Sequence, residues 1–485
     1  MEHGAMDISF ETLPAEHIIR IAKEVSLRQT QEDFVPDGAC NVFINTRDGK
    51  TLLDFFASAG ATWAGYGNPH LKLVCIREVV SKLLNNTRAN PDTLNCNSFS
   101  GLPDYPLARM FIAGLIEFIR ETFVPDPDCY TVAGTALKYF LTKELYPWKR
   151  PMVAGLFSIG SEANEKALKT WFNQRPERTV CLTFSAGLEE GAFPGRTLGS
   201  LALNASKEVH RRHFPKWGHP ANPIVLPYPR ATGAIPDAEA YIKRIEEKVD
   251  AALNGVPRTI IQGAHLELVL GEGGFYAADR ELLYAFERWR KENDVLLLID
   301  EIQTGMCWTG TMLALEQYPE LDPDAVTLGK AIACGIAPVS ATIVRSDFNY
   351  EEFGRDSSTA GGYQFGAAIA LETIKWMMQN RWWNRTRAMG TYIAEKVRET
   401  CGRYQRLLDP ATPFSGLGMM QGVGFSAKEI RDFVKARVFE KGLFIEGTGY
   451  KRLRLRPPQI ITESQFDQGM LIIDETLREA DHKFS

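Results

Sequence analysis

The chain has few of the features that would direct it to a membrane, to nucleic acid or to the outside of the cell. None of its apolar runs reaches the roughly 18 residues of a membrane span, and its polar, acidic N-terminus lacks the apolar core of a signal peptide. The net charge is −5 and no long basic run appears, which argues against nucleic acid or an anionic membrane as a partner. We therefore expect a cytoplasmic protein, with the mitochondrial matrix as the alternative.

Cysteine and histidine show no functional spacing either. The eight cysteines are scattered without a C-x-x-C pair, which favours reduced thiols in an intracellular protein. The eight histidines have no paired spacing, so the sequence predicts no metal site. The 485 residues, of which 45% are apolar and 24% charged, are typical of a globular protein with two or more domains.

The middle of the chain alternates between strand-like and helix-like segments. Strands separated by helices imply right-handed βαβ units and a mostly parallel sheet, so we predict an α/β fold. The strands are expected at residues 152–158, 178–184, 258–270, 295–300 and 323–329, and the amphipathic helices at residues 161–172 and 279–293.

The two ends of the chain indicate a smaller second domain. Residues 14–30 predict a helix, and residues 41–56 predict a hairpin with Asp48 and Gly49 in its turn. Residues 431–458 suggest a small α+β domain that includes the N-terminal strands. The predicted division is residues 1–85 as the N-terminal part of the small domain, 86–364 as the large domain and 365–485 as the C-terminal small domain.

One predicted strand ends in a carboxylate. Residues 295–299 are all apolar, as in a strand buried on both faces, and Asp300 follows directly. A buried unpaired charge costs several kcal/mol. Asp300 therefore needs a fixed positive partner.

Two further segments place groups that could bind a cofactor at the ends of predicted strands. In "FSIGSEANEKALKTWF" a strand runs into Gly160 and Ser161 and a helix begins at once, which offers N–H groups and a positive dipole end to a phosphate. A plain N-cap serine would give the same pattern. In "AVTLGKAIACG" Lys330 follows a short apolar strand, where a surface lysine would look alike.

The order of these segments connects them. In an open α/β sheet the carboxyl ends of the strands converge on one crevice. Pyridoxal 5′-phosphate (PLP) needs a helix N-terminus for its phosphate, a carboxylate for its ring nitrogen and a lysine for a Schiff base. The expected partner of Asp300 is therefore the protonated ring nitrogen of this cofactor.

The sequence also resembles a known family, the class III (fold-type I) PLP-dependent aminotransferases, from about residue 40 to 475. The shared motifs are "GSEANEKALK", "FPGRTLGS", "LLLIDEIQTG", "TGTMLALEQY", "PDAVTLGKAIACG" and "LRLRPP". Within the class the chain is most similar to the 4-aminobutyrate (GABA) aminotransferases, through "GYGNPHL", "GRTLGSLALNASKEVHRRHFP" and "LELVLGEGGF". The resemblance implies a large PLP-binding domain and a small α+β domain built from both chain ends.

The resemblance implies a role for each residue of the cofactor site. Lys330 would be the Schiff-base lysine and Asp300 the partner of the ring nitrogen. Gln303 would face the 3′-oxygen of the ring. Gly160 and Ser161 would hold the phosphate.

Two more residues are assigned in the same way. Phe193, in "GAFPGRT", would stack on the ring, with a core aromatic as the alternative. Thr359, in "SSTAGG", would reach the phosphate of the neighbouring subunit, with a simple turn threonine as the alternative. A site completed by both chains implies a homodimer with shared active sites.

Three charged residues would bind substrate. By the resemblance, Arg196 would hold the distal carboxylate of GABA or glutamate, although it could also be a surface arginine. Glu272 would neutralise Arg454 for an ω-amino acid and swing away when glutamate brings its α-carboxylate to that arginine. Glu267, on the same strand as Glu272, is expected to support the site rather than to touch substrate.

The chain departs from the family at several positions. Pro194 stands where most relatives have histidine, and Trp308 where relatives often have arginine. By the resemblance, Ala59 replaces a bulky aliphatic of the GABA pocket, and Trp63 is expected to refill part of that space as a second lining residue. Residues 119–150 form an extra aromatic-rich segment without an assigned counterpart.

The predicted function is PLP-dependent transamination of an ω-amino acid or amine, GABA-like, with a keto acid, 2-oxoglutarate by preference. The small-molecule amino donor and the keto acid are then the only partners besides the second subunit. The alternatives are a PLP-dependent aminomutase or decarboxylase on the same fold, or a non-catalytic scaffold. Retention of Lys330, Asp300 and Gln303 together argues against the scaffold.

Overall fold

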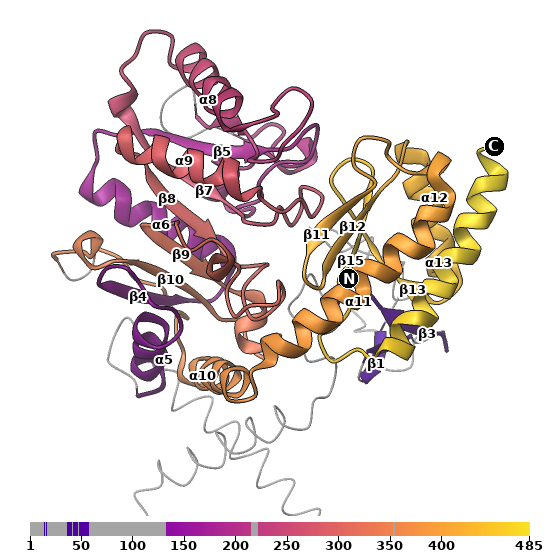
Figure 1. The fold of residues 1–485 in the computed structure, drawn as a ribbon. Helices are drawn as coiled ribbons and strands as arrows, with labels where there is room; N and C mark the ends of the chain where they lie inside the picture. The colour runs from indigo at the N-terminus through magenta and orange to yellow at the C-terminus, as the bar shows by residue number, and fades with distance from the viewer. Residues whose placement is uncertain are drawn as a thin grey trace, which may run out of the picture.

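The large part of the molecule is built on one seven-stranded sheet (Figure 1). The computed structural model describes residues 14, 16, 36–40, 42–46, 48–57, 132–214, 222–352 and 355–485. All strands of the large sheet run parallel except β10, which is antiparallel to both of its neighbours. The predicted α/β class with a mostly parallel sheet is therefore confirmed. In spatial order the strands are β4 (Met152–Phe157), β10 (Ser340–Arg345), β9 (Ala325–Leu328), β8 (Leu296–Asp300), β7 (Ile261–Leu266), β5 (Val180–Ser185) and β6 (Ile224–Pro227).

Amphipathic helices cover this sheet. In α9 (Arg280–Glu292) the Asp279 side chain accepts hydrogen bonds from the N–H groups of Glu281 and Leu282, so the helix begins where its predicted apolar stripe begins. α6 (Gly160–Gln174) packs on β9 and β10, and α8 (Ala238–Leu253) packs on β6. α5 (Val132–Lys143), which lies in the described part of the extra segment, packs on β4 and on α10 (Gln364–Gln379). In the described part of the chain no helix is both long and apolar enough to cross a membrane.

The small part of the molecule combines both ends of the chain. The predicted hairpin is present: β2 and β3 are antiparallel, and Gly49 takes a positive φ of 83° in the turn. β3 in turn pairs in parallel with β13, which lies almost 400 residues further along the chain. The predicted domain boundaries stay predictions, and the predicted helix at residues 14–30 lies almost wholly outside the described residues.

Two four-stranded sheets make up this part, with three long helices beside them. The first sheet has the order β1 (Pro36–Cys40), β2 (Phe43–Thr46), β3 (Thr51–Asp54) and β13 (Leu443–Phe444). The second has the order β11 (Phe414–Leu417), β12 (Met420–Gly424), β15 (Arg452–Leu455) and β14 (Glu446–Thr448). The helices are α11 (Trp382–Cys401), α12 (Lys428–Glu440) and α13 (Glu463–Lys483).

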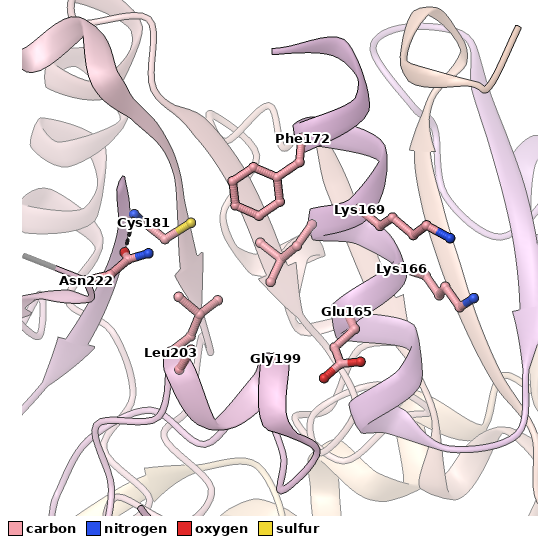
Figure 2. A pocket seen from close by; sticks show the side chains of 10 residues that line it. Glu165, Lys166, Lys169, Phe172, Cys181, Gly199, Leu203 and Asn222 are labelled. Carbon is pink, nitrogen blue, oxygen red and sulfur yellow. Dashed lines mark hydrogen bonds between the residues drawn. The ribbon is translucent and has the colours of Figure 1, made fainter. Parts of the chain in front are cut away.

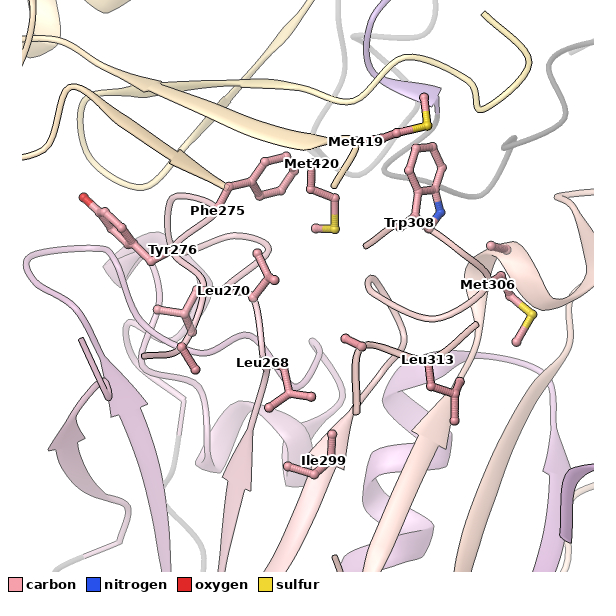
Figure 3. Packing of buried hydrophobic residues seen from close by; sticks show 14 of the residues in the cluster. Leu268, Leu270, Phe275, Tyr276, Ile299, Met306, Trp308, Leu313, Met419 and Met420 are labelled. Carbon is pink, nitrogen blue, oxygen red and sulfur yellow. The ribbon is translucent and has the colours of Figure 1, made fainter. Parts of the chain in front are cut away.

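An apolar cluster joins the two parts above the carboxyl ends of the large sheet (Figure 3). Leu268 and Leu270 follow β7, Trp308 follows β8, and Met420 reaches them from β12. Each is buried, and full burial of such a side chain stabilises by about 1.5–3 kcal/mol. The approach is close because Gly418, at φ 60°, lets the turn before β12 come against the backbone of Trp308. The small sheet is thereby held over the edge at which the functional residues lie.

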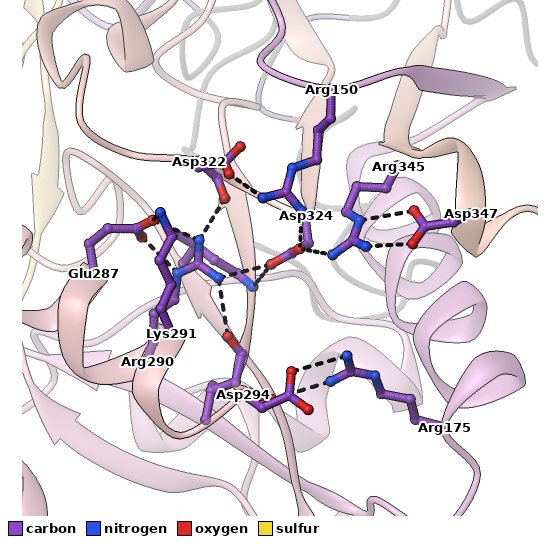
Figure 4. Close-up of polar contacts among 12 residues, drawn as sticks. Arg150, Arg175, Glu287, Arg290, Lys291, Asp294, Asp322, Asp324, Arg345 and Asp347 are labelled. Carbon is purple, nitrogen blue, oxygen red and sulfur yellow. Dashed lines mark hydrogen bonds and ion pairs between the residues drawn. The ribbon is translucent and has the colours of Figure 1, made fainter.

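The opposite edge of the large sheet carries a buried ion-pair network (Figure 4). Asp324, just before β9, accepts hydrogen bonds from Arg290 at 3.0 Å, from Arg345 at 2.8 Å and from the backbone N–H of Leu297 at 2.9 Å. Arg290 also donates to Glu287 at 2.7 Å. Each buried charge has several partners, as a structural network requires. We interpret this edge as structural.

Candidate active site

The carboxyl ends of β4, β8 and β9 meet at one point. Gly160 begins α6 shortly after β4, and Gly329 directly follows β9 as the N-cap of the next short helix. A Cβ atom on Gly160 would lie 2.8 Å from Ile302, and one on Gly329 would lie 3.7 Å from the Cα atom of Gly160. Three segments that are far apart in the sequence are thus in contact, as the crevice of an open α/β sheet predicts.

The N-terminus of α6 is open to an anion. The N-cap residue is Ile159, and no side chain caps the first turn. Ser161 is therefore not the plain N-cap that the sequence left as an alternative. Its Oγ accepts a hydrogen bond from the backbone N–H of Arg196 at 3.3 Å. The N–H groups and positive dipole end of this turn are suited to a phosphate.

Asp300 is buried at the end of β8 and is held by three donors. Its Oδ1 accepts from the backbone N–H of Ile302 at 2.9 Å, and its Oδ2 accepts from Asn164 Nδ2 at 2.8 Å. His265 Nε2 lies 3.0 Å from the same Oδ2, which requires that nitrogen to carry a hydrogen. Within the described residues no lysine or arginine forms an ion pair with this carboxylate. The carboxylate is therefore held in a fixed orientation without the positive partner expected from the sequence. A protonated ring nitrogen of PLP would be such a partner.

Sequence reasoning missed Asn164 and His265. Asn164 Oδ1 accepts from Thr327 Oγ1 at 2.7 Å, so its amide group is turned towards Asp300 and the carbonyl of Pro194. His265 lies in an apolar strand, where a histidine usually reads as a core residue. Its place at the carboxyl end of β7, next to β8, was the available signal.

Lys330 begins a short helical turn directly after β9. Its backbone has a positive φ of 44°, a strained conformation for a side chain of this size. Burial, and then the charge of Arg456, lowers the pKa of the amine to about 8, although Glu272 and Asp300 act to raise it. In the described part of the chain Nζ makes no hydrogen bond or ion pair. An amine that is partly neutral near physiological pH is a competent nucleophile.

The loop that carries Phe193 is tied to the same site. Glu267 Oε1 accepts from the backbone N–H of Phe193 at 2.8 Å, and Oε2 accepts from Gly271 at 2.9 Å. Burial, and then the nearby Asp300, raises the pKa of Glu267 to about 7. Glu267 thus positions the backbone of two loops, in the supporting place expected for it.

Arg196 lies beside Phe193. Its guanidinium lies 5.0 Å from the ring centre of Phe193, and its Nη2 lies 3.3 Å from His210 Nε2. Burial, followed by the charge of Arg196, lowers the pKa of His210 to about 4, so this histidine is neutral at physiological pH. Arg196 itself is exposed in the single chain and has no carboxylate partner in the described residues. Its guanidinium remains available to an anionic group.

Gln303 and the Glu272–Arg454 pair complete the site. A Cβ atom on Gly271 would lie 2.4 Å from the Gln303 amide, so a larger residue there would force this amide to move. Glu272 Oε1 accepts from Arg454 Nη1 at 2.7 Å, and both side chains are largely buried. The predicted pairing partner of Glu272 is therefore in contact with it. Lys207 Nζ lies 4.0 Å from the other oxygen of Glu272, an interaction that the sequence did not reveal.

The charges around Glu272 favour its ionised form. Burial opposes ionisation, but Arg454 and then Lys207 outweigh it and lower the pKa of Glu272 to about 2. The guanidinium of Arg454 also lies 5.0 Å from the ring centre of Phe56. Ionised Glu272 thus neutralises Arg454 and holds it in place where little solvent reaches.

Three predicted site residues stay predictions. Thr359 lies exposed in a turn whose Ala360 carbonyl accepts from Ser158 Oγ at 3.3 Å, and one chain alone does not test its reach to a partner subunit. Ala59 and Trp63 lie outside the described residues.

A separate cavity of about 530 Å³ contains none of the predicted site residues (Figure 2). It lies between α6 and β5, with the apolar side chains of Phe172 and Leu203 directed into it. Burial raises the pKa of its Cys181 thiol to about 12, which leaves that thiol unreactive. Lys166 and Lys169 point away from it in Figure 2 and pair with Asp356.

A buried carboxylate, a lysine at the next strand end and an uncapped helix N-terminus on a mostly parallel sheet define a PLP-dependent enzyme of fold type I. The chain belongs to the class-III aminotransferase family, which it matches over residues 151–477. It is a PLP-dependent aminotransferase, as the sequence predicted.

Relatives and solved structures agree with this assignment. The chain is 30% identical to the acetylornithine aminotransferase of Archaeoglobus fulgidus, over 94% of this chain and 99% of that protein. It is 27% identical to the diaminobutyrate–2-oxoglutarate transaminase of Nocardia farcinica, over 90% of this chain and 87% of that protein. The ornithine aminotransferase of Toxoplasma gondii, whose active site holds PLP at partial occupancy, has the same fold, with a TM-score of 0.73 and 19% identity over 96% of this chain and 95% of that one. The likeness to the GABA group stays a prediction.

Proposed function

We propose that the enzyme transfers the terminal amino group of a GABA-like ω-amino acid or amine to a keto acid, with 2-oxoglutarate as the preferred acceptor. The observation that carries this proposal is the Glu272–Arg454 ion pair at 2.7 Å. An ω-amino acid has no carboxylate on the carbon that bears its amino group. The pair therefore keeps Arg454 neutralised while such a donor reacts.

The same pair accounts for the second substrate. 2-Oxoglutarate carries a carboxylate next to its reacting carbon, which pairs bidentately with Arg454 when Glu272 moves away. Arg196 binds the distal carboxylate of either substrate. One pocket thereby serves a donor and an acceptor that differ by one carboxylate, as a ping-pong reaction requires.

The residues of the cofactor site have distinct tasks in this proposal. When bound, PLP supplies an aldehyde that takes up the amino group and a protonated ring that accepts electrons from the substrate carbon. Gly160 and Ser161 would hold its phosphate, Phe193 would stack on its ring and Gln303 would donate to its 3′-oxygen. Asp300, held by Asn164 and His265, would keep the ring nitrogen protonated.

Lys330 has two tasks. Its Nζ would hold the aldehyde of bound PLP in the resting enzyme, and as a free amine it would move a proton at the substrate carbon that bears the nitrogen. An amine pKa of about 8 suits this second task, because the neutral base and its protonated form are both accessible near neutral pH.

The relatives support an amino-acid donor with a terminal amino group. One is named for acetylornithine and another for diaminobutyrate and 2-oxoglutarate. We also propose a homodimer in which Thr359 reaches the phosphate of the partner subunit, and a donor pocket lined by Ala59 and Trp63. A cytoplasmic or mitochondrial location completes the proposal.

The test is a donor screen on the PLP-loaded protein in the absence of keto acid. GABA, 5-aminovalerate, N-acetylornithine and 2,4-diaminobutyrate are added singly, and the absorbance near 420 nm is followed. A transaminase loses this absorbance with donor alone and regains it with 2-oxoglutarate or pyruvate. Carbon dioxide release without a keto acid would identify a decarboxylase, and an isomeric amino acid as the product would identify an aminomutase.

A further inference from the structure

Two arginines at the C-terminal end of the chain are fully buried but differ in their partners. Arg452, in β15, uses all three side-chain nitrogens: Nε donates to Gly274 O at 3.1 Å, Nη1 to Thr412 O at 2.7 Å and Nη2 to Ser415 Oγ at 2.7 Å. Arg456, just after the same strand, uses only Nη1, while its Nε and Nη2 have no hydrogen-bond partner. The first arginine has the bonding of a structural residue and the second does not.

The surroundings of Arg456 do not balance its charge. Its guanidinium lies 5.2 Å from the ring centre of Trp308 and 5.5 Å from that of Phe275. No carboxylate of the described residues forms an ion pair with it. Burial, and then Arg454, lowers its pKa well below the usual range, while Glu272 and Asp54 oppose this. A buried cation without a partner destabilises a fold, so its presence calls for a function.

The one side-chain bond of Arg456 leads to the cofactor site. Nη1 donates to Gln303 Oε1 at 3.1 Å. Because the oxygen of this amide is taken by a cation, its NH2 group is the end left for another partner. A positive charge on the acceptor end polarises an amide and strengthens its N–H groups as donors.

We propose that Arg456 is a positioning residue of the active site, which holds Gln303 by its side-chain oxygen so that the amide NH2 group donates to the 3′-oxygen of PLP. This inference rests on the proposed role of Gln303. It adds that the strength of this donor depends on a buried cation from the small part of the molecule. Arg456 acts through Gln303 and touches neither substrate nor the reacting carbon.

The same charge acts on Lys330. Arg456 lowers the pKa of the Lys330 amine, while Glu272, Asp300 and Glu267 raise it. Arg456 is the only cation among these four groups. Removal of its charge therefore favours the protonated form of the Lys330 nitrogen, whether that nitrogen is free or bonded to the cofactor.

The experiment compares Arg456→Met with Arg452→Met, a matched loss of one buried arginine close by on the same segment. In the apoprotein, Arg452→Met should lower Tm by several degrees, because the Thr412 carbonyl loses its donor and the buried Gly274 carbonyl keeps only that of Ser415. Arg456→Met should leave Tm unchanged or raise it, because an unpaired buried charge is removed. If Arg456→Met is as unstable as Arg452→Met, the arginine is structural and the proposal is overturned.

The second readout is the pH titration of the visible absorbance of the PLP-loaded protein. In Arg456→Met the midpoint of this absorbance titration should rise by about one pH unit. This is the size expected when one positive charge is removed from the surroundings of the protonated Lys330 nitrogen. Arg456→Lys should restore most of the midpoint, and Arg452→Met should not move it. An unchanged midpoint in Arg456→Met overturns the proposal.

A double-mutant cycle tests the route through Gln303. If Arg456 acts through the amide, PLP dissociation from Gln303→Ala should be hastened little further by Arg456→Met, whereas Arg456→Met alone should hasten it about tenfold. Additive effects overturn this route. None of these measurements uses a substrate, so a wrong donor in the proposed function leaves them unaffected. If the wild-type protein shows no visible absorbance after loading with PLP, the proposed function is wrong. The Tm comparison of the apoproteins would then still show whether Arg456 is a structural residue.

Discussion

Replacement of Glu272 by glutamine separates the two half-reactions more sharply than any other single change in this site. Glu272→Gln keeps the size of the side chain and removes its charge. Arg454 then faces the donor half-reaction unpaired, although only 7% of its side chain is exposed. Lys207, 4.0 Å from the other oxygen of Glu272, loses the same carboxylate.

The expected size follows from the burial of the pair. Removal of one partner of a buried charged hydrogen bond costs about 2–5 kcal/mol. The lower value applies here because 13% of Glu272 is exposed and Arg454 keeps its contact with Phe56. About 2 kcal/mol corresponds to an approximately 30-fold slower donor half-reaction. The 2-oxoglutarate half-reaction should slow less than about threefold, because the substrate carboxylate replaces Glu272 as the partner of Arg454.

The two half-reactions are timed separately by single-turnover absorbance changes. Glu287→Gln is the matched control, since Glu287 is also a largely buried carboxylate paired with an arginine, Arg290, at 2.7 Å, but on the opposite edge of the sheet. It should cost stability without a bias between the half-reactions. Arg454→Ala should show the reverse bias, with the keto-acid half-reaction slowed more. Equal slowing of both halves by Glu272→Gln would refute the switch and leave the pair as a structural ion pair.

Three further predictions concern the cofactor site. Lys330→Ala should abolish turnover while PLP is still held noncovalently, and wild-type turnover in that variant would end the assignment of this lysine. Asp300→Asn should lower the rate by several orders of magnitude with a modest loss of Tm, because an amide cannot accept from every donor that holds the carboxylate. Activity within a factor of ~10, about 1.4 kcal/mol of barrier, would show that the charge is not needed. Because the pKa of Lys330 is lowered to about 8, the neutral amine increases as pH rises towards that value. PLP uptake by the apoprotein, followed by stopped-flow absorbance, should therefore accelerate with pH and level off above about 8, and a pH-independent rate would contradict the shift.

The parts of the site that sequence analysis located are those carried by short motifs at strand ends. Asp300 and Lys330 each come at the end of an apolar run, and the order of these segments along the chain places both at the same edge of the sheet. The hairpin around Gly49 and the amphipathic pattern of α9 are equally local signals. The pairing of Glu272 with Arg454 required the family resemblance, because almost 200 residues separate them.

The residues that were missed owe their place to tertiary approach. Arg456 lies two residues after Arg454 and has the same residue type, yet one is paired and the other is not. That difference arises only when the chain after β15 lies over the loop that carries Gln303. Lys207 reaches Glu272 in a similar way, from a loop in another part of the sequence. No spacing rule in a single sequence predicts such contacts.

The parallel pairing of β3 with β13 has a consequence for synthesis on the ribosome. β3 ends at Asp54, but its partner strand begins only at Leu443. Nearly the whole chain must therefore be synthesised before this sheet can be completed. Arg454 and Arg456 emerge later still. The large sheet has all its strands by residue 345 and can form earlier. Nascent chains therefore expose an unpaired strand edge for most of translation, and a truncation of a few dozen C-terminal residues removes the active-site arginines together with that closure.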